Sequence, residues 1–414
     1  MRDTLELTLP FVDEVVILDT GCCTPPSQLR QLRIDYPHKP IHVCEATSSF
    51  VDAGTSRNEL LCEARARSTA QYFLSLNVSD RIIGGAYMRT WLMHYSSLPS
   101  TTSTSSTSGT STTTSGGAPT VFLVQFECNR VVSMATRLFT NHKRLQYRWP
   151  VHEYLCDADT GDMCVRAVVP TRVRIAHPAT TPRRLPQDKA LLLALLPRVV
   201  DDIAMLQRAW YYIAQTCIDL QQHTEALFWL EQRIQQEGKN KEEYYLSVVR
   251  WAYLKLQTME TVQDATVIDV SGCGDHSGAH RTLQYVCPEN IAQYTPILQR
   301  LVHVYGMYPQ RAEALYYLAY IYGYISTPRN VAYAYVLASE VCRKAELYGR
   351  ANCVQSDIYE FLRWDMLGHL AYMMGNYEEA IASTMTALGY KHITEEKQRE
   401  LHDMLAVYQE RVAL

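Results

Sequence analysis

The chain has 414 residues, of which 47% are hydrophobic, and its formal net charge is −4. This length allows two or three domains, and the near balance of acids and bases excludes non-specific binding to nucleic acid or to an anionic membrane surface as the main activity. No apolar run approaches the roughly 20 residues of a membrane span, and the acidic start of the chain is unlike a secretory signal. The 12 cysteines have no framework spacing, which favours reduced thiols in a cytoplasmic protein.

The first 95 residues alternate between short apolar runs and amphipathic segments, as β-α-β units do. Strands are expected at 15–18, 41–44 and 72–78. A first helix is expected to end within 5–11, and a second to follow a cap at Ser27. A third is expected from a cap at Thr55 or Ser56 to about Ala70, and a fourth over 84–95. The predicted fold of this part is an α/β, Rossmann-like mixed sheet.

The composition changes at residues 96–118, which are almost entirely Ser, Thr and Gly. Such a segment cannot bury apolar surface, so we expect a flexible, exposed insertion. Strands resume at 121–126 and 136–139, and 177–186 reads as an extended linker. The α/β domain is therefore predicted to cover residues 1–178.

From residue 187 the hydrophobic period is 3.6, which predicts an all-α domain over 187–414. The same spacing of large and small residues occurs twice, in Trp210, Ile213, Ala214, Cys217 and Ala226 and in Trp364, Leu367, Gly368, Ala371 and Ala380. A looser copy contains Leu315, Leu318, Ala319 and Tyr322. The spacing resembles the tetratricopeptide repeat, with a generic helical bundle as the alternative. A turn is expected at 375–377, and a Gly-rich loop insertion at about 257–287.

Polar side chains follow two of the strands predicted in the α/β part. Asp19 stands at the tip of the first strand, and Asn77 and Asp80 follow the third. Arg57 and Asn58 lie near the start of a helix, whose free N–H groups favour anions. Strand ends with acidic or amide side chains, beside a helix that begins with a cation, are how an α/β sheet binds a phosphorylated ligand.

Together with His152 and Glu153, these residues resemble the motifs of inverting, family-two glycosyltransferases of the GT-A type, and the resemblance covers about residues 5–178. It implies a set of residues that hold a nucleotide-diphosphate sugar: Asp19, Arg57, Asn58 and Asn77. It also implies that Glu153 is the general base for the acceptor hydroxyl, with His152 as the runner-up.

The chain departs from this family pattern in two places. Relatives carry Asp-x-Asp for Mg²⁺ or Mn²⁺, whereas this chain has Asn77-Val78-Ser79 followed by Asp80. We therefore expect Asp80, together with His177 near the end of the domain, to bind a divalent cation only weakly. Three outcomes are open: weak metal binding, catalysis without a metal, or loss of catalysis. The family's first strand is also not found, so a gap is expected in the sheet, left by truncation or filled by another segment.

The expected function is transfer of a sugar to a hydroxyl of a protein or glycan acceptor that the repeats position. The alternative is a catalytically degenerate glycosyltransferase-like protein that acts as a binding or scaffold protein through its repeats, which commonly bind peptides. The Ser/Thr-rich insertion is a further candidate acceptor. One loop contains four residues of types that can bind zinc: Cys273, His276, His280 and Cys287. Their spacing matches no zinc-binding motif, so we expect their proximity in the sequence to be incidental.

Overall fold

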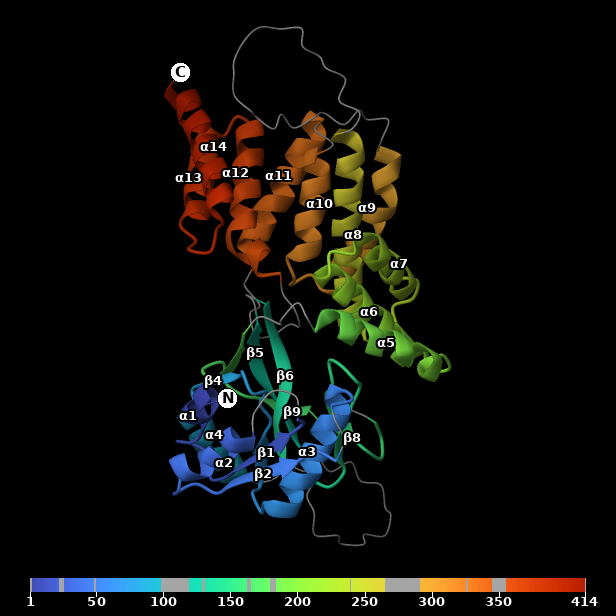
Figure 1. Cartoon of the computed structure of the whole chain (residues 1–414). Helices are drawn as coiled ribbons and strands as arrows, with labels where there is room; N and C mark the ends of the chain where they lie inside the picture. Colours follow the sequence, from blue (N-terminus) through green and yellow to red (C-terminus); the bar gives the residue numbers. More distant parts are fainter. Residues whose placement is uncertain are drawn as a thin grey trace, which may run out of the picture. The chain divides into compact units, whose positions relative to one another are not determined.

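The structure is a computed structural model that describes residues 2–21, 26–47, 50–97, 119–128, 131–161, 165–178, 184–238, 240–264, 291–324, 327–344 and 355–413 (Figure 1). Most of the expected Ser/Thr-rich insertion and the four zinc-like residues lie outside these ranges. Contacts divide the chain into an α/β unit that ends at Ala194 and a helical unit that begins at Leu195. No helix among the described residues is both long and apolar enough for a bilayer.

The α/β unit begins with short helices and strands in alternation. They are α1 (Arg2–Thr8), β1 (Val15–Asp19), α2 (Pro26–Asp35), β2 (Ile41–Glu45), α3 (Ala53–Arg67), β3 (Tyr72–Leu74), β4 (Arg81–Ile83) and α4 (Gly85–Ser97). Strands follow: β5 (Val121–Cys128), β6 (Val131–Thr140), β7 (Leu145–Arg148), β8 (Tyr154–Asp157), β9 (Val165–Val168) and β10 (Arg174–His177). Most of the expected helices and strands are confirmed to within a few residues. The sequence does not predict β4 and β7–β10, because strands this short show no clear hydrophobic period.

The main sheet is mixed and has the strand order β3-β6-β5-β10-β4. Strand β5 pairs antiparallel with β6 on one edge, and on its other edge it pairs in parallel, first with β9 and then with β10. Val121, Phe122 and Val124 of β5 are fully buried, because helices and strands cover both faces of this central strand. The expected α/β class with a mixed sheet is therefore confirmed.

Strands β1 and β2 form a separate parallel pair (Figure 1). Among the described residues, no strand joins this pair to the main sheet, and β7 and β8 form a third, antiparallel pair. The described strands therefore form separate sheets, β1 with β2, the main sheet, and β7 with β8.

Several predicted boundaries are wrong for local reasons. Helix α3 begins at Ala53 and not at Thr55, because the Asp52 carboxylate caps it by accepting from the Thr55 N–H at 2.7 Å. Strand β3 ends at Leu74 and not at residue 78, because the backbone turns at 77–80. The linker ends before α5 (Leu185–Val199), and residues 257–264 belong to a helix instead of the expected loop.

The second unit is helical and TPR-like. Its elements are α6 (Ile203–Asp219), α7 (His223–Arg233), α8 (Lys241–Asp264), α9 (Ile291–Met307), α10 (Glu313–Tyr324), α11 (Pro328–Arg343), η2 (Ile358–Leu362), α12 (Arg363–Met373), α13 (Tyr377–Leu388) and α14 (Glu395–Ala413). Successive helices pack together as pairs, α6 with α7, α10 with α11 and α12 with α13. The repeated spacing therefore marks helix–turn–helix pairs, as predicted.

The small residues of the repeated spacing lie where two helices approach closely. Ala226 and Ala380 are fully buried on the second helices of their pairs. A Cβ on Gly368 would lie 2.7 Å from Oγ1 of Thr384, so the small side chain lets α12 pack against α13. Gly375, with φ of 78°, makes the expected turn between them.

The helical unit also contains a buried ionic network that the spacing does not predict. Arg311 donates two hydrogen bonds to Glu313, of 2.6 and 3.2 Å, and one of 3.2 Å to Glu242. The hydroxyls of Tyr245 and Tyr359 donate to Oε2 of Glu313 at 3.2 and 3.0 Å. Helix α8, the start of α10 and η2 are thereby tied together at one carboxylate.

Candidate functional site

Two segments that are almost 100 residues apart in the chain meet at the start of α3. The side chain of Asn58 donates to the Tyr147 carbonyl at 2.8 Å and accepts from the Tyr147 N–H at 2.7 Å. A Cβ on Gly54 would lie 2.2 Å from the Trp149 carbonyl oxygen, so only glycine allows this approach. The segment with Arg57 and Asn58 and the segment that leads to His152 and Glu153, which both resemble family motifs, are therefore in direct contact.

Arg57 lies at the centre of this junction. Its guanidinium donates to Oγ of Ser75 at 2.7 Å, to Oδ1 of Asn77 at 2.6 Å, and through Nε to the carboxylate of Glu153. The same guanidinium lies 5.6 Å from the ring centre of Tyr147. The first turns of α3, the end of β3 and the segment after β7 are thus joined through one cation.

Glu153 contacts a second cation that the sequence analysis did not single out. Nη1 of Arg137, on β6, lies 3.7 Å from Oε1 of Glu153. Burial alone would raise the pKa of Glu153, but the charges of Arg57 and Arg137 outweigh it and place that pKa below its ordinary value. Burial, and then the charge of Arg57, lower the pKa of Arg137. A lone cation within an apolar strand was the signal that could have identified Arg137.

Asp80 and His177 form a second cluster. The Asp80 carboxylate is fully buried; Oδ2 accepts from the Asn77 N–H at 2.7 Å, and Oδ1 lies 2.5 Å from Nδ1 of His177. The His177 ring stacks on Phe126 with 5.5 Å between ring centres. The structure therefore brings together the two residues that were expected to share a metal.

The geometry of Asp80 and His177 does not fit a divalent cation. Mg²⁺ and Mn²⁺ prefer several oxygen ligands, and Mg²⁺ usually keeps bound waters. Both oxygens of Asp80 already accept hydrogen bonds, and the carboxylate has no exposed surface. Nowhere in the described ranges do three or more His, Cys, Asp or Glu side chains come close enough to hold a metal ion. A divalent cation would have to displace these hydrogen bonds in order to bind to Asp80.

The two remaining candidates lie at chain turns. The Asp19 carboxylate accepts from the Gly21 N–H at 2.9 Å, which closes the turn at the end of β1. His152 is exposed, has a positive φ of 53° and directly precedes Glu153. The hydrogen bonds and ion pairs described above join eight residues, which form the interacting core of the site: Arg57, Asn58, Ser75, Asn77, Asp80, Arg137, Glu153 and His177.

Comparison with known proteins gives no family for the chain: no protein-family model matches it, and neither does any curated protein. Solved structures with some similarity include a thermophilic TPR protein of Thermus thermophilus, with 14% identity over 56% of this chain and 92% of that chain and a TM-score of 0.33. A tetratricopeptide repeat protein from Parabacteroides merdae has 13% identity over 55% of this chain and 78% of that chain, with a TM-score of 0.27. The assignment of helical repeats rests on the packed pairs α6–α7, α10–α11 and α12–α13.

Proposed function

We propose that the α/β unit is a GT-A-like glycosyltransferase module that binds the diphosphate of a nucleotide sugar at Arg57 and Arg137. It would transfer the sugar to a hydroxyl of a protein or glycan acceptor. The observation that carries the proposal is the convergence of Arg57, Ser75, Asn77 and Glu153 from separate elements. Arg57 and Arg137 both lie beside the Glu153 carboxylate, and an anionic ligand could replace that carboxylate as their partner.

The transfer step follows from this arrangement. The acceptor hydroxyl oxygen attacks the anomeric carbon, the bond from that carbon to the diphosphate oxygen breaks, and its electron pair leaves with the diphosphate. Arg57 and Arg137 stabilise the charge on the leaving group, and Glu153 takes the hydroxyl proton. A phosphate that hydrogen-bonds to Arg57 displaces Glu153 from it, which raises the pKa of Glu153 and makes it a better base at the moment when the donor is bound.

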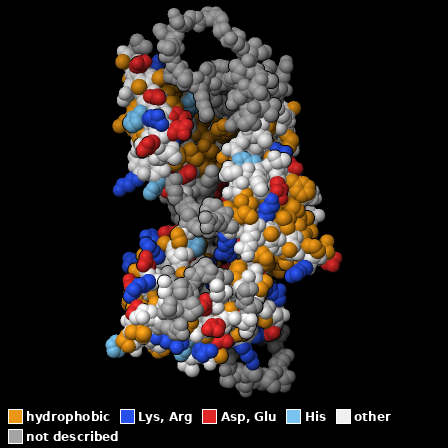
Figure 2. Space-filling view, viewed as in Figure 1, with side chains coloured by type: hydrophobic (Ala, Val, Ile, Leu, Met, Phe, Trp, Pro, Cys, Tyr) orange, Lys and Arg blue, Asp and Glu red, His pale blue; other side chains and the backbone are white. Residues whose placement is uncertain are grey.

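The second candidate is a protein that binds through its repeats and has no transfer activity. It is favoured by the mutual neutralisation of Arg57 and Glu153 and by the poor fit of Asp80 and His177 to a metal. Figure 2 shows hydrophobic side chains gathered around α6 and α7, where Ile203 and Phe228 are exposed. Exposed apolar side chains on helical repeats are suited to a protein partner.

The test is calorimetric titration with a panel of UDP- and GDP-sugars, with turnover of the donor measured in parallel. Arg57→Ala should weaken donor binding roughly 10- to 100-fold, because charge-assisted hydrogen bonds to the phosphate are lost. Arg67→Ala, at the partly exposed end of the same helix, is the matched control and should leave binding unchanged. Glu153→Gln should keep or increase affinity and lower turnover at least roughly 100-fold.

The outcomes separate the two candidates. Binding with turnover that depends on Glu153 supports the transferase. Binding without turnover supports a protein that has kept only the ligand site. An absence of binding across the panel defeats the proposal for the α/β unit altogether.

A further inference from the structure

The hydroxyl of Tyr147, on β7, is buried and has no hydrogen-bond partner among the described residues. Buried tyrosines usually donate to an acceptor, as Tyr245 and Tyr359 do to Glu313 in the helical unit. A buried polar group without a partner loses its hydrogen bonds to water and gains none in return. The Tyr147 hydroxyl therefore destabilises the fold, and its presence needs an explanation other than folding.

Other contacts already hold Tyr147 in place. The side chain of Asn58 binds its backbone N–H and carbonyl, at 2.7 and 2.8 Å, and Tyr147 pairs with Leu155 across β7 and β8. Its ring makes an edge-on contact with Phe139, with 6.2 Å between the ring centres. A phenylalanine could make every one of these contacts, so they do not require the hydroxyl.

Arg137 also has hydrogen-bond donors that the described residues do not use. Nη1 lies 3.7 Å from Oε1 of Glu153, which is beyond the range of a hydrogen bond. The guanidinium also lies 5.6 Å from the centre of the Phe126 ring, which offers no carboxylate or carbonyl acceptor. Because a guanidinium has five N–H donors and 14% of this side chain is exposed, donors are available to a ligand.

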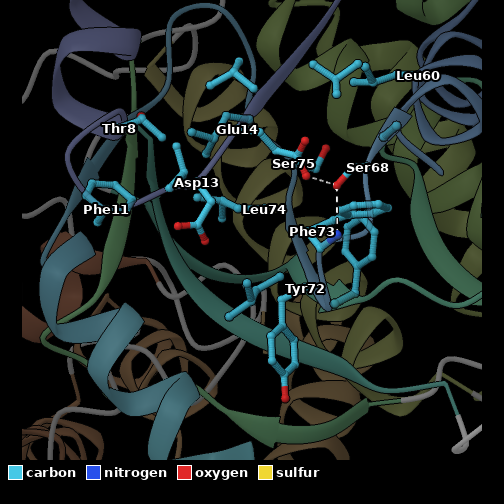
Figure 3. A pocket seen from close by; sticks show the side chains of 18 of the residues that line it. Thr8, Phe11, Asp13, Glu14, Leu60, Ser68, Tyr72, Phe73, Leu74 and Ser75 are labelled. Carbon is cyan, nitrogen blue, oxygen red and sulfur yellow. Dashed lines mark hydrogen bonds between the residues drawn. The ribbon is translucent and has the colours of Figure 1, made fainter. Parts of the chain in front are cut away.

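These unused donors belong to one site. Tyr147 is close enough to act electrostatically on the guanidinium groups of both Arg57 and Arg137. The Arg57 guanidinium lies 5.6 Å from the centre of the Tyr147 ring. Both residues line a cavity of about 510 Å³, and so does Ser75, which accepts a hydrogen bond from Arg57 (Figure 3). Arg57 and Tyr147 therefore border a space that a ligand can enter.

We propose that Tyr147 is the third donor of a phosphate-binding site, in which its hydroxyl donates to a phosphate group that Arg57 and Arg137 also bind. The inference rests on the proposed function for the identity of the ligand, the diphosphate of a nucleotide sugar. A tetrahedral phosphate has oxygens on several sides, so it can accept from donors on α3, β6 and β7 at once.

A side chain beside the Tyr147 hydroxyl has to move before a ligand can reach it, because the hydroxyl is buried. The proposed transfer step already contains such a movement, since the phosphate displaces Glu153 from Arg57. The binding of the phosphate then gives the hydroxyl the acceptor that it lacks in the free chain, and the energetic cost of burying it is offset when the ligand binds.

The test compares Tyr147→Phe with the native full chain by calorimetric titration with pyrophosphate and with the panel of UDP- and GDP-sugars. The variant should bind pyrophosphate and the nucleotide sugar at least roughly tenfold more weakly, because a hydrogen bond to a charged group is lost. The midpoint of urea unfolding without ligand should stay the same or rise, because the hydroxyl has no partner in the free chain. A purely structural hydroxyl would give a lower midpoint and an unchanged affinity.

The matched control is Tyr408→Phe. The hydroxyl of Tyr408 is also buried without a partner among the described residues, but it lies on α14 of the helical unit. Removing it should leave the affinity for pyrophosphate within about twofold.

The outcomes separate this inference from the proposed function. If Tyr147→Phe binds the nucleotide sugar as tightly as the native chain does, the inference is overturned and the proposed function stands. If pyrophosphate alone binds, and Tyr147→Phe weakens it, the phosphate site is supported and the transferase is not. A lower midpoint of urea unfolding in Tyr147→Phe overturns the inference, because the hydroxyl then has a partner in the free chain, and so does an absence of binding by every ligand.

Discussion

Each of the two units holds an Arg–Glu pair away from water, and the pairs differ in what surrounds them. In the helical unit the side chains of Arg311 and Glu313 are each 1% exposed, and two tyrosine hydroxyls complete the contacts of the carboxylate. In the α/β unit the side chains of Arg57 and Glu153 are each 10% exposed, and Arg57 lines a cavity.

The balance of charge differs as well. Arg311 lies between two carboxylates, Glu313 and Glu242, so its charge is fully compensated. Glu153 lies near two guanidinium groups, those of Arg57 and Arg137, and the Asp80 carboxylate acts on both of them as a second anion. A saturated pair with every partner inside the fold holds that fold together, whereas a pair beside a cavity can exchange one partner for a ligand.

The largest expected effect comes from breaking the saturated pair. Glu313→Gln keeps the shape of the side chain but leaves Arg311 buried with only the more exposed Glu242 to compensate it. An uncompensated buried charge costs about 3–5 kcal/mol, and we expect a loss near the lower end of that range. Urea unfolding followed by circular dichroism measures the change in the free energy of unfolding.

The control for this variant is an exposed pair in the same unit. Glu340→Gln breaks the ion pair with Arg343, both of whose side chains are well exposed, and should cost less than about 0.5 kcal/mol. If both variants cost the same, the Arg311 network does not stabilise the helical unit.

The next effect concerns the junction that positions Arg57. In Gly54→Ala the new Cβ would meet the Trp149 carbonyl at 2.2 Å, and a backbone atom cannot rotate away. We expect a loss of about 1–3 kcal/mol in the stability of the α/β unit. Gly306→Ala in α9, where a Cβ meets nothing within 4 Å, should instead stabilise by up to about 1 kcal/mol. Thermal unfolding of both variants checks the pair, and a neutral Gly54→Ala would contradict the close contact.

The two units also differ in how much of them the sequence predicts. The α6–α7 and α12–α13 pairs follow from a period that is local to each helix, so they could be predicted with their turn at Gly375. Strand β3 could be placed for the same reason but not its end, since it stops at Leu74 and Asn77 and Asp80 lie in the turn that follows.

Contacts between distant residues are what the sequence does not predict. Arg57 and Glu153 were given separate roles, and only the folded chain makes them partners across 96 positions. The Arg311 network and the role of Arg137 were missed because their partners lie on other elements, where no spacing rule connects them. Sequence patterns therefore predict helices and strands better than they predict which charged side chains meet.

The smallest effect is a pH dependence of stability that only the α/β pair should cause. The pKa of Glu153 is lowered from 4.5 in the folded chain, because the charges of Arg57 and Arg137 outweigh the opposing effect of burial. The folded state therefore binds fewer protons than the unfolded state, so the ion pair stabilises the fold above about pH 4.5 and this contribution is lost as the pH falls through the folded pKa.

Glu153→Gln removes this contribution, so the difference in unfolding free energy between the native chain and the variant should shrink as the pH is lowered from 7 to about 3. Urea unfolding at a series of pH values measures it, with Glu6→Gln, an exposed carboxylate on α1 of the same unit, as the control that should show little slope. A difference that stays constant over this range would mean that Glu153 does not gain its stability from the two arginines. The electrostatic contrast between the α/β pair and the Arg311 pair would then have no energetic consequence.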